Sequence, residues 1–485
     1  MSGSELTVRL DTELPDSLPV GRGTAIFCLG ACFHPEERLR GLDILVDGEA
    51  QRPAAWRMPR LDLHRLAAEP GPGWYRSGFW ATLPIEARDR AGAIELGVSA
   101  RLESGRHTTA PLGRIEVVES EAPPPLVRVG ADTIVVCMAT FEPDFELFRA
   151  QVASLRAQTD TDWVCLISDD SSAPERFDRI RMEVDGDARF VLTRSPRNLG
   201  YYRNFERALG LVPREAKLIA LCDHDDRWYP AKLEVLRRSL GTAQLVYSDQ
   251  RLVDRNGRIL RDTLWKGRRN NHTNLTSLLV ANTITGAAAL FRREVAERAL
   301  PFPDPPGWRF HDHWLGLVAL ASGDVAYVER PLYDYVQHPG AVVGKAVGAR
   351  DRPRRGGLKA FLRGGRAQYF YGYVARELMA QALLVRCGPV LSARKRRALE
   401  RFIAAPRSPL AFAWLAGRPL RALAGSNETL GTESEFARGI AWRHLIAVRT
   451  GRRETPGRSP YEASCPPLDA ATPGQERLAR WRARV

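Results

Sequence analysis

The feature that most constrains this chain is a regular alternation of apolar runs and amphipathic stretches that begins at residue 132. Nearly continuous apolar runs predict buried strands over 133–141, 163–170, 188–195, 217–228 and 244–249. Between the first two, residues 145–158 carry apolar side chains at the i, i+3, i+4 and i+7 spacing of a helix. Apolar strands separated by helices predict an α/β domain with a mostly parallel sheet covered on both faces.

Acidic residues gather where these predicted strands end. Three strand ends carry them: Asp169 with Asp170, Asp223 with Asp225 and Asp226, and Asp249. In an open α/β sheet this edge is the ligand crevice. One acid there could be a turn or a cap, but several on one edge repel one another unless a cation or a donor-rich ligand lies between them. The Asp223-His224-Asp225 segment suits a hard divalent cation with positions left open for diphosphate oxygens.

The sequence lacks the motifs of several other classes of nucleotide-binding proteins and hydrolases. The sequence has no G-x-x-x-x-G-K-[ST] loop, and no G-x-G-x-x-G follows the first predicted strand. This argues against P-loop ATPases and dinucleotide oxidoreductases. It also has no G-x-S-x-G elbow and no H-E-x-x-H helix. A nucleotide diphosphate held through acids and a metal remains the simplest interpretation.

A second polar cluster lies further along the chain. His311, Asp312, His313 and Trp314 open a predicted amphipathic helix, and His338 follows a predicted short strand and turn. An acid at a helix start can serve only as an N-terminal cap. The density of His, Asp and Trp in four residues favours a catalytic role for Asp312.

Five segments in this order resemble the motifs of the family-2 inverting glycosyltransferases, and rhamnosyltransferase-like members most. They are SDDSS (168–172), NLGYYRNF (198–205), DHDDRW (223–228), HDHW (311–314) and YVQHPGAVVG (335–344). The resemblance covers about residues 132–344 and implies an A-type nucleotide-sugar fold. SDDSS lacks the family's usual glycine, HDHW has a second histidine, and YVQHPGAVVG has Val and Pro at positions where other residues are common.

The resemblance implies a role for each matching residue. The donor would be bound by Thr140, Glu142, Asp169, Asp170, Asn198, Arg203 and Asp223. Mn²⁺ or Mg²⁺ would be held by Asp223, Asp225 and His338, and Asp312 would be the general base. The acceptor side would carry Trp228, His311, His313 and Trp314, although either tryptophan could be a core residue.

The implied activity is metal-dependent, inverting transfer of a sugar from a nucleotide diphosphate to a hydroxyl of a lipid-linked or cell-envelope glycan. We expect rhamnose from a deoxythymidine-diphosphate donor (dTDP-rhamnose), with a uridine-diphosphate (UDP) hexose as the alternative. Two rival functions are an inactive sugar-binding scaffold, disfavoured because every acid needed is present, and a nucleic-acid-binding protein, for which no motif is found.

Composition divides the rest of the chain. Residues 1–121 are short β-type runs that predict a β-sandwich-like accessory domain, and 122–131 form a Pro-rich linker. The catalytic domain is predicted over 132–344. A basic helical region is expected over 345–449 and a flexible tail over 450–485.

The positive charge lies at one end. The chain carries +14 overall, whereas residues 345–485 hold 28 Lys and Arg against 10 Asp and Glu, so they carry +18 and residues 1–344 carry −4. This asymmetry favours an anionic membrane surface as partner, contacted through Arg394–Arg397, Phe412 and Trp414. A bundle packed on the catalytic domain is the alternative. With no signal peptide, no spanning segment and seven cysteines without a C-x-x-C pair, we expect a cytoplasmic protein on the inner membrane face.

Overall fold

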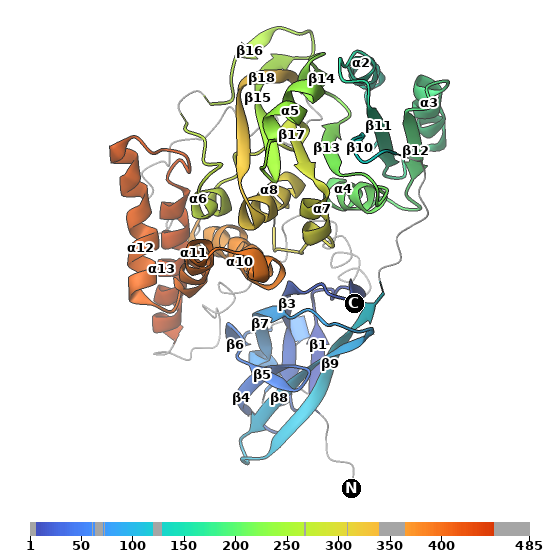
Figure 1. Ribbon diagram of the computed structural model, residues 1–485. Helices are drawn as coiled ribbons and strands as arrows, with labels where there is room; N and C mark the ends of the chain where they lie inside the picture. Colours follow the sequence, from blue (N-terminus) through green and yellow to red (C-terminus); the bar gives the residue numbers. More distant parts are fainter. Residues whose placement is uncertain are drawn as a thin grey trace.

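The computed structural model describes residues 6–60, 62–63, 71, 73–119, 129–265, 268–307, 309–338 and 364–450, with side chains up to residue 446. Three parts follow one another along the chain: a β-rich N-terminal domain, a central α/β domain and a set of C-terminal helices (Figure 1). The predictions for most of the linker (122–128), for residues 339–363 and for the tail 451–485 lie outside the described residues.

The N-terminal domain is a sandwich of two sheets, as its alternating β-type runs predicted. One sheet has the order β1(Thr7–Leu10)-β3(Thr24–Phe33)-β7(Gly78–Ile85)-β6(Ala55–Met58). The other has the order β2(Ser17–Pro19)-β9(His107–Val118)-β8(Gly92–Leu102)-β4(Leu39–Val46)-β5(Glu49–Gln51). Side chains such as Ile44, Phe79 and Val98 fill the space between the sheets. Trp80, the next residue after Phe79, points to the opposite face because side chains alternate along a strand.

The central sheet is mixed rather than mostly parallel, which corrects the prediction. Four strands at one side are parallel: β12(Phe190–Arg194), β11(Trp163–Asp169), β10(Ile134–Thr140) and β13(Leu218–Asp223). Next comes β17(Ala289–Arg292), antiparallel to both of its neighbours. Beyond it lie β15(Leu245–Asp254), β18(Val325–Gln337) and β14(Arg227–Trp228), and β16(Ile259–Arg261) pairs with β15. A four-residue strand such as β17 leaves too short a pattern to be found in the sequence.

Two strands run further than their sequences predicted. β15 continues past Asp249 to Asp254, so Asp249 does not lie at a strand end; its carboxylate accepts hydrogen bonds from the Thr263 hydroxyl and from the Leu264 amide. β18 is one strand through the segment that was predicted to turn. The ladder between the two strands shifts register around Asp249, and this irregularity lets both strands pass it.

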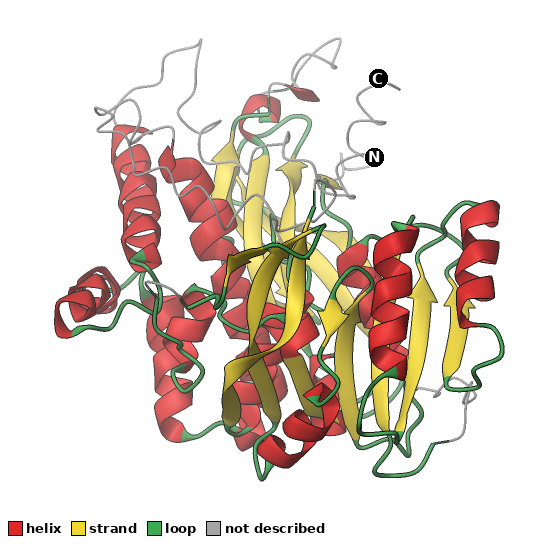
Figure 2. Cartoon of the chain, turned by 90° about the horizontal axis from the view of Figure 1, so that it is seen from above, coloured by secondary structure: helices red, strands yellow, loops and turns green. Residues whose placement is uncertain are grey.

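Helices flank the central sheet, as Figure 2 shows from above. They are α2(Phe145–Arg156), α3(Pro174–Val184), α4(Tyr201–Gly210), α5(Lys232–Leu240), α6(Leu275–Val280), α7(Arg293–Ala299) and α8(His311–Ser322). α2 begins where the Asp144 side chain accepts a hydrogen bond from the Glu146 amide. In α8 ten of the twelve residues are buried, because it is enclosed by α4, α6, α7 and the C-terminal α10.

The C-terminal helices join the other two parts. The π-helix η3(Gln368–Val374) runs into α10(Ala375–Cys387), followed by η4(Gly388–Val390), α11(Ala393–Ala404), α12(Pro409–Gly417), η5(Arg418–Ala424) and α13(Thr432–Thr450). The Trp80 ring meets Phe370 at a centroid distance of 5.3 Å. Arg386 of α10 donates to the Gly23 carbonyl (2.8 Å) in the sandwich and to the Ala299 carbonyl (2.6 Å) in the central domain. Along the described parts of the chain, no helix has the length and apolar character needed to cross a membrane.

Candidate functional site

The carboxyl ends of β10, β11 and β13 meet at one edge of the sheet, as the strand pattern predicted. Their parallel register places Thr140 beside Asp169 and Ala139 beside Asp223. Two loops that leave this edge contain residues with left-handed backbone, Glu142 (φ 46°) and Ser171 (φ 66°). Such conformations are costly outside glycine and concentrate at binding sites.

Asp169 and Asp170 shape the loops of this edge with their carboxylates. Asp169 is fully buried and accepts hydrogen bonds from the Ser172 hydroxyl (2.6 Å) and the Ser172 amide (3.0 Å). Asp170 accepts from the amides of Leu199 (2.7 Å) and Gly200 (2.8 Å), and burial raises its pKa. Asp169 is therefore bonded within its own loop, whereas Asp170 ties that loop to the loop before α4.

The other predicted donor residues divide into two groups. Glu142 accepts from the Ala173 amide (2.6 Å) and pairs with Arg176 (2.7 Å), and the Asn198 amide donates to the Asp170 carbonyl (3.2 Å), so both lie at the edge. Arg203 instead donates to Glu206 (2.5 Å) and to the Phe302 carbonyl (3.0 Å). Its guanidinium thus faces the 302–304 segment, and a contact of Arg203 with the nucleotide stays a prediction.

The DHDDRW segment brings three carboxylates together at the end of β13. Asp225 accepts a hydrogen bond from the His338 ring across 2.8 Å, which joins residues far apart in the sequence and lowers the pKa of Asp225 against the effect of burial. Burial, followed by the charge of Asp225, raises the pKa of Asp223. Asp226 is completely buried, and burial raises its pKa as well.

The fit of this edge to a divalent cation is partial. Among the described residues, no three His, Cys, Asp or Glu side chains converge closely enough to hold a metal ion by themselves. Asp223, Asp225 and His338 nevertheless lie at one edge, and mutual repulsion of the carboxylates would be relieved by a positive charge. Mg²⁺ commonly takes one or two carboxylates and completes its shell with substrate phosphates and water. The residues present suit such a shared ion rather than a closed protein site.

A buried lysine, Lys232, lies near the Asp223 and Asp226 carboxylates and was not predicted from the sequence. The Lys232 ammonium lies 3.5 Å from the ring centroid of Trp228 and 4.4 Å from that of Tyr333, and it donates to the Ala287 carbonyl. Burial lowers its pKa to about 7. Trp228 is 3% exposed, and Lys232 covers one face of its ring. Trp228 was predicted to contact the acceptor, but because its ring is buried it has a packing role instead. One lysine in a helical pattern gives no sequence signal for such burial.

Asp312 stands at the start of α8, held by three hydrogen-bond donors. Its Oδ1 accepts from the His313 amide (2.6 Å) and from the Asn282 side chain (3.1 Å), and its Oδ2 accepts from the Gly286 amide (3.2 Å). Burial nevertheless raises the pKa of Asp312 to about 6. Gly286, whose amide donates to Asp312, packs against β13: a Cβ at residue 286 would lie 3.5 Å from the Leu221 side chain. Asp312 therefore lies close to the end of β13, and its charge contributes to the raised pKa of Asp223.

Gly286 is required by this arrangement. A Cβ at that position would approach the His311 ring to 2.7 Å and the Asp312 Cβ to 3.4 Å. The segment that wraps the Asp312 carboxylate can therefore lie this close only because residue 286 has no side chain.

The three other residues of HDHW are core residues, which corrects their prediction as acceptor contacts. His311 is 8% exposed and stacks on Phe205 at 3.8 Å, and His313 is 1% exposed with its Nε2 2.7 Å from the Leu278 carbonyl. Trp314 is fully buried and donates to the Ala299 carbonyl (2.9 Å). The reason is that α8 packs against other elements on almost every side, so only Asp312 of these four faces the site.

A comparison with known families agrees with this geometry. Residues 135–300, about a third of the chain, match the family described as "Glycosyl transferase family 2". A comparison with curated proteins gave no match.

A comparison with solved structures gave matches of low sequence identity and low TM-score. S. aureus TarS 1–349 in complex with UDP-GlcNAc is 13% identical, with 67% of this chain and 93% of that chain covered and a TM-score of 0.42. The mannosyltransferase PcManGT from Pyrobaculum calidifontis, in complex with GDP-Man and Mn²⁺, is 16% identical, with 67% and 90% covered and a TM-score of 0.33.

Proposed function

We propose that this protein is an inverting glycosyltransferase that uses a nucleotide-diphosphate sugar as donor. The observation that carries the proposal is the position of Asp312 at the same sheet edge as Asp223 and Asp225, which lie in the region that matches family 2. A carboxylate with a pKa near 6 is ionised at neutral pH yet basic enough to accept a proton. Its three fixed donors hold it in one orientation.

Asp312 then removes the proton from the acceptor hydroxyl as that oxygen attacks the anomeric carbon. One displacement inverts the configuration, so no carboxylate nucleophile is needed. Asp223, Asp225 and His338 would hold Mn²⁺ or Mg²⁺, which when bound supplies positive charge for the leaving diphosphate. The loops built by Asp169, Asp170 and Asn198, together with Thr140 and Glu142, line the donor side.

The donor we propose is dTDP-rhamnose, with a UDP-hexose as the alternative, because the sequence motifs resemble rhamnosyltransferases most. A thermal-shift screen of dTDP-, UDP- and GDP-sugars with Mn²⁺ or Mg²⁺ tests this, since a donor that binds only the folded protein raises its melting temperature. We expect a shift with dTDP-rhamnose. A shift with uridine nucleotides alone would favour the alternative, and no shift with any nucleotide sugar would contradict the function.

We also propose that the C-terminal helices contact an anionic membrane that carries a lipid-linked acceptor. Residues 388–424 contain eight basic residues and one acid. Within them, three leucines are strongly exposed: Leu410 (80%), Leu420 (67%) and Leu423 (87%). Exposed apolar side chains amid positive charge suit a lipid interface.

The structure changes which side chains would make this contact. Lys395 donates to the Gly323 carbonyl (2.8 Å) and Arg396 to the Gly388 carbonyl (2.8 Å), so two of the four predicted cations are engaged within the protein. Phe412 and Trp414 pack against the core. The exposed residues Arg394, Arg397 and Arg407, with the three leucines, form the basic-leucine surface.

Co-sedimentation with vesicles tests the basic-leucine surface. Each arginine near an anionic leaflet contributes about 1 kcal/mol, so we expect binding to anionic vesicles that weakens with salt. The variant Arg397→Ser/Arg407→Ser/Leu410→Ser/Leu423→Ser should lose most of it. The matched control Arg238→Ser/Leu260→Ser changes an exposed arginine and a half-exposed leucine of the central domain and should bind as the wild type. Equal vesicle binding by both variants would contradict the proposal that the basic-leucine surface contacts the membrane.

A further inference from the structure

The side chain of Asn282 is fixed in one orientation against Asp312. Its Nδ2 donates to Asp312 Oδ1 (3.1 Å) and to the Ile284 carbonyl (2.8 Å), while its Oδ1 accepts from the Ile284 amide (3.0 Å). The two bonds to Ile284 decide which end of the amide faces Asp312. A donor, never an acceptor, is therefore presented to the carboxylate.

The backbone of Asn282 is held in turn by Arg268. Arg268 donates to the Asn282 carbonyl (2.9 Å) through Nη2 and to the Glu428 carbonyl (2.8 Å) through Nε. Glu428 belongs to the loop 425–431, which lies between η5 and α13 in the C-terminal region. One arginine thus connects the segment that wraps Asp312 to a part of the chain some 150 residues further on.

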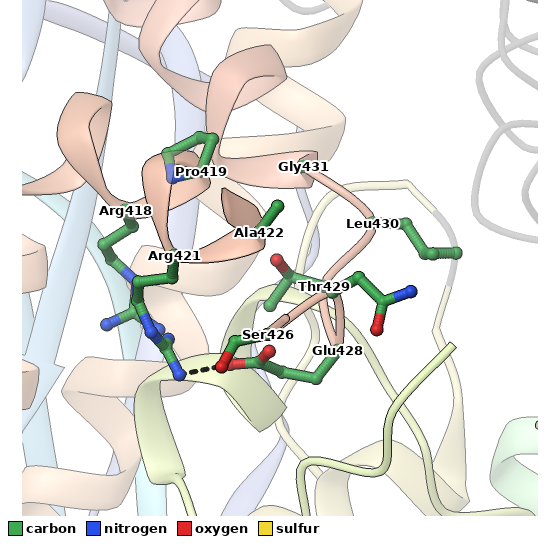
Figure 3. A pocket seen from close by; sticks show the side chains of 10 residues that line it. Arg418, Pro419, Arg421, Ala422, Ser426, Glu428, Thr429, Leu430 and Gly431 are labelled. Atoms are coloured by element: carbon green, nitrogen blue, oxygen red, sulfur yellow. Dashed lines mark ion pairs between the residues drawn. The ribbon is translucent and has the colours of Figure 1, made fainter. Parts of the chain in front are cut away.

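The loop 425–431 is itself locked by buried charge. Glu428 is 5% exposed, and its carboxylate pairs with Arg421 (Figure 3). The same carboxylate accepts a hydrogen bond from the Ser277 hydroxyl (3.1 Å) of α6. Arg418 donates to the same hydroxyl (2.7 Å) and pairs with Glu433 (3.2 Å). Both arginines that line the cavity of about 190 Å³ at this loop are therefore paired with glutamates, and the cavity belongs to a structural clamp on α6.

α6 connects the loop 425–431 with the segment that contacts Asp312. Ser277 lies in α6, which ends at Val280, two residues before Asn282. In addition, Asn271 donates to the carbonyls of Ser277 (3.0 Å) and Ala281 (2.8 Å). The 282–286 segment therefore emerges from a helix whose position is set both by the C-terminal loop and by Asn271.

We propose that Asn282 is the positioning residue for Asp312, and that the loop 425–431 holds Asn282 in place through Arg268. The inference rests on the proposed function, because it assigns a role in orienting the general base. It makes the C-terminal region part of the catalytic apparatus in addition to any membrane contact. A base that swings out of line loses rate steeply, by as much as about 10²-fold for a displacement of 1 Å.

Kinetics of Asn282→Ala and Asn282→Asp test the proposal. We expect kcat to fall about 10- to 100-fold in Asn282→Ala, with the donor dissociation constant unchanged. Asn282→Asp has the same size but turns an acceptor towards Asp312, so its loss should be larger. The acidic limb of the kcat profile should move to higher pH in Asn282→Ala, because the ionised carboxylate loses a donor. The backbone amides of His313 and Gly286 remain as donors. The titratable groups whose charges interact with Asp312 are Asp223, Tyr201, Tyr333 and Tyr335.

A separate pair of variants, one test and one control, examines whether Arg268 holds Asn282 in place. Arg268→Met removes both bridging hydrogen bonds, and we expect a kcat loss of several-fold to about tenfold with donor affinity kept. Arg269→Met is the matched control: its exposed side chain is changed, while its backbone amide still donates to Asn427 (3.0 Å). Arg269→Met should behave as the wild type. If Asn282→Ala does not fold, Arg268→Met, which lies outside the site, decides.

The possible outcomes distinguish the positioning role of Asn282 from the proposed glycosyltransferase function. If Asp312→Asn is inactive while Asn282→Ala and Arg268→Met keep the wild-type kcat and pH profile, the positioning role is overturned and the function stands. A variant whose donor affinity falls as far as its kcat would also overturn it, because that is general loss of structure. If the wild type turns over no nucleotide sugar, the proposed function fails and the inference fails with it.

Discussion

Replacing Asp312 by asparagine is expected to lower kcat by about 10²–10⁴-fold, the usual contribution of a positioned acid–base group. The amide keeps the size of the carboxylate but cannot accept the proton of the acceptor. Donor affinity should persist, because the donor site we propose is formed by the loops around Asp169 and Asp170 at the end of β11. The wild-type kcat should also fall as the pH drops below about 6, since burial raises the pKa of Asp312 to about 6 and only the ionised form is a base.

Steady-state kinetics together with donor titration by calorimetry check this expectation. Asp178→Asn, which changes an exposed carboxylate on α3, serves as the matched control and should leave both constants unchanged. A weaker donor affinity with an intact kcat in Asp312→Asn would instead make Asp312 a structural residue of the α8 start.

Replacing Asp225 by alanine is expected to abolish turnover and metal-dependent nucleotide binding. Asp225 is the carboxylate bonded to His338. In the proposed function, Asp225 and Asp223 together make the contact with the metal and the diphosphate. Removing Asp225 takes away a ligand and frees His338, while Asp223 loses a repelling neighbour, so that its pKa should fall. We therefore expect nucleotide affinity to become the same with and without Mn²⁺.

Calorimetric titration of the nucleoside diphosphate, with Mn²⁺ and with EDTA, measures this effect. The wild type should bind more tightly with Mn²⁺, and Asp178→Ala should match the wild type in both conditions. Full wild-type activity in EDTA would contradict metal dependence and leave Asp225 as a partner of His338 alone.

The strands that the sequence predicted best are those that are buried on both faces. β10, β11 and β13 lie within the apolar runs 133–141, 163–170 and 217–228, because burial on both sides of a sheet forces an uninterrupted apolar pattern. β17 is too short to show a period, and the extensions of β15 and β18 include polar residues that pair with each other across the ladder. The presence of β17 and the full lengths of β15 and β18 depend on pairing with strands far away in the sequence, and a local residue pattern carries no information about such partners.

The candidate site divides in the same way. The strand-end acids and Asp312 could be predicted because their residue types and order carry the chemistry. Asn282 and Lys232 could not, since each acts through contacts with residues 30 or more positions away or through burial alone. His311, His313 and Trp314 were misplaced because their sequence neighbour Asp312 faces the site, whereas α8 turns their side chains into the core.

The anomeric configuration of the first-formed product tests the central claim most directly. With the donor found in the thermal-shift screen, and with water as acceptor if no glycan acceptor is known, proton NMR can follow the sugar before it equilibrates in solution. A single displacement assisted by Asp312 predicts that the sugar first appears with the configuration opposite to that of the donor, and that Asp312→Asn forms almost none. A first product with the configuration of the donor would contradict the account.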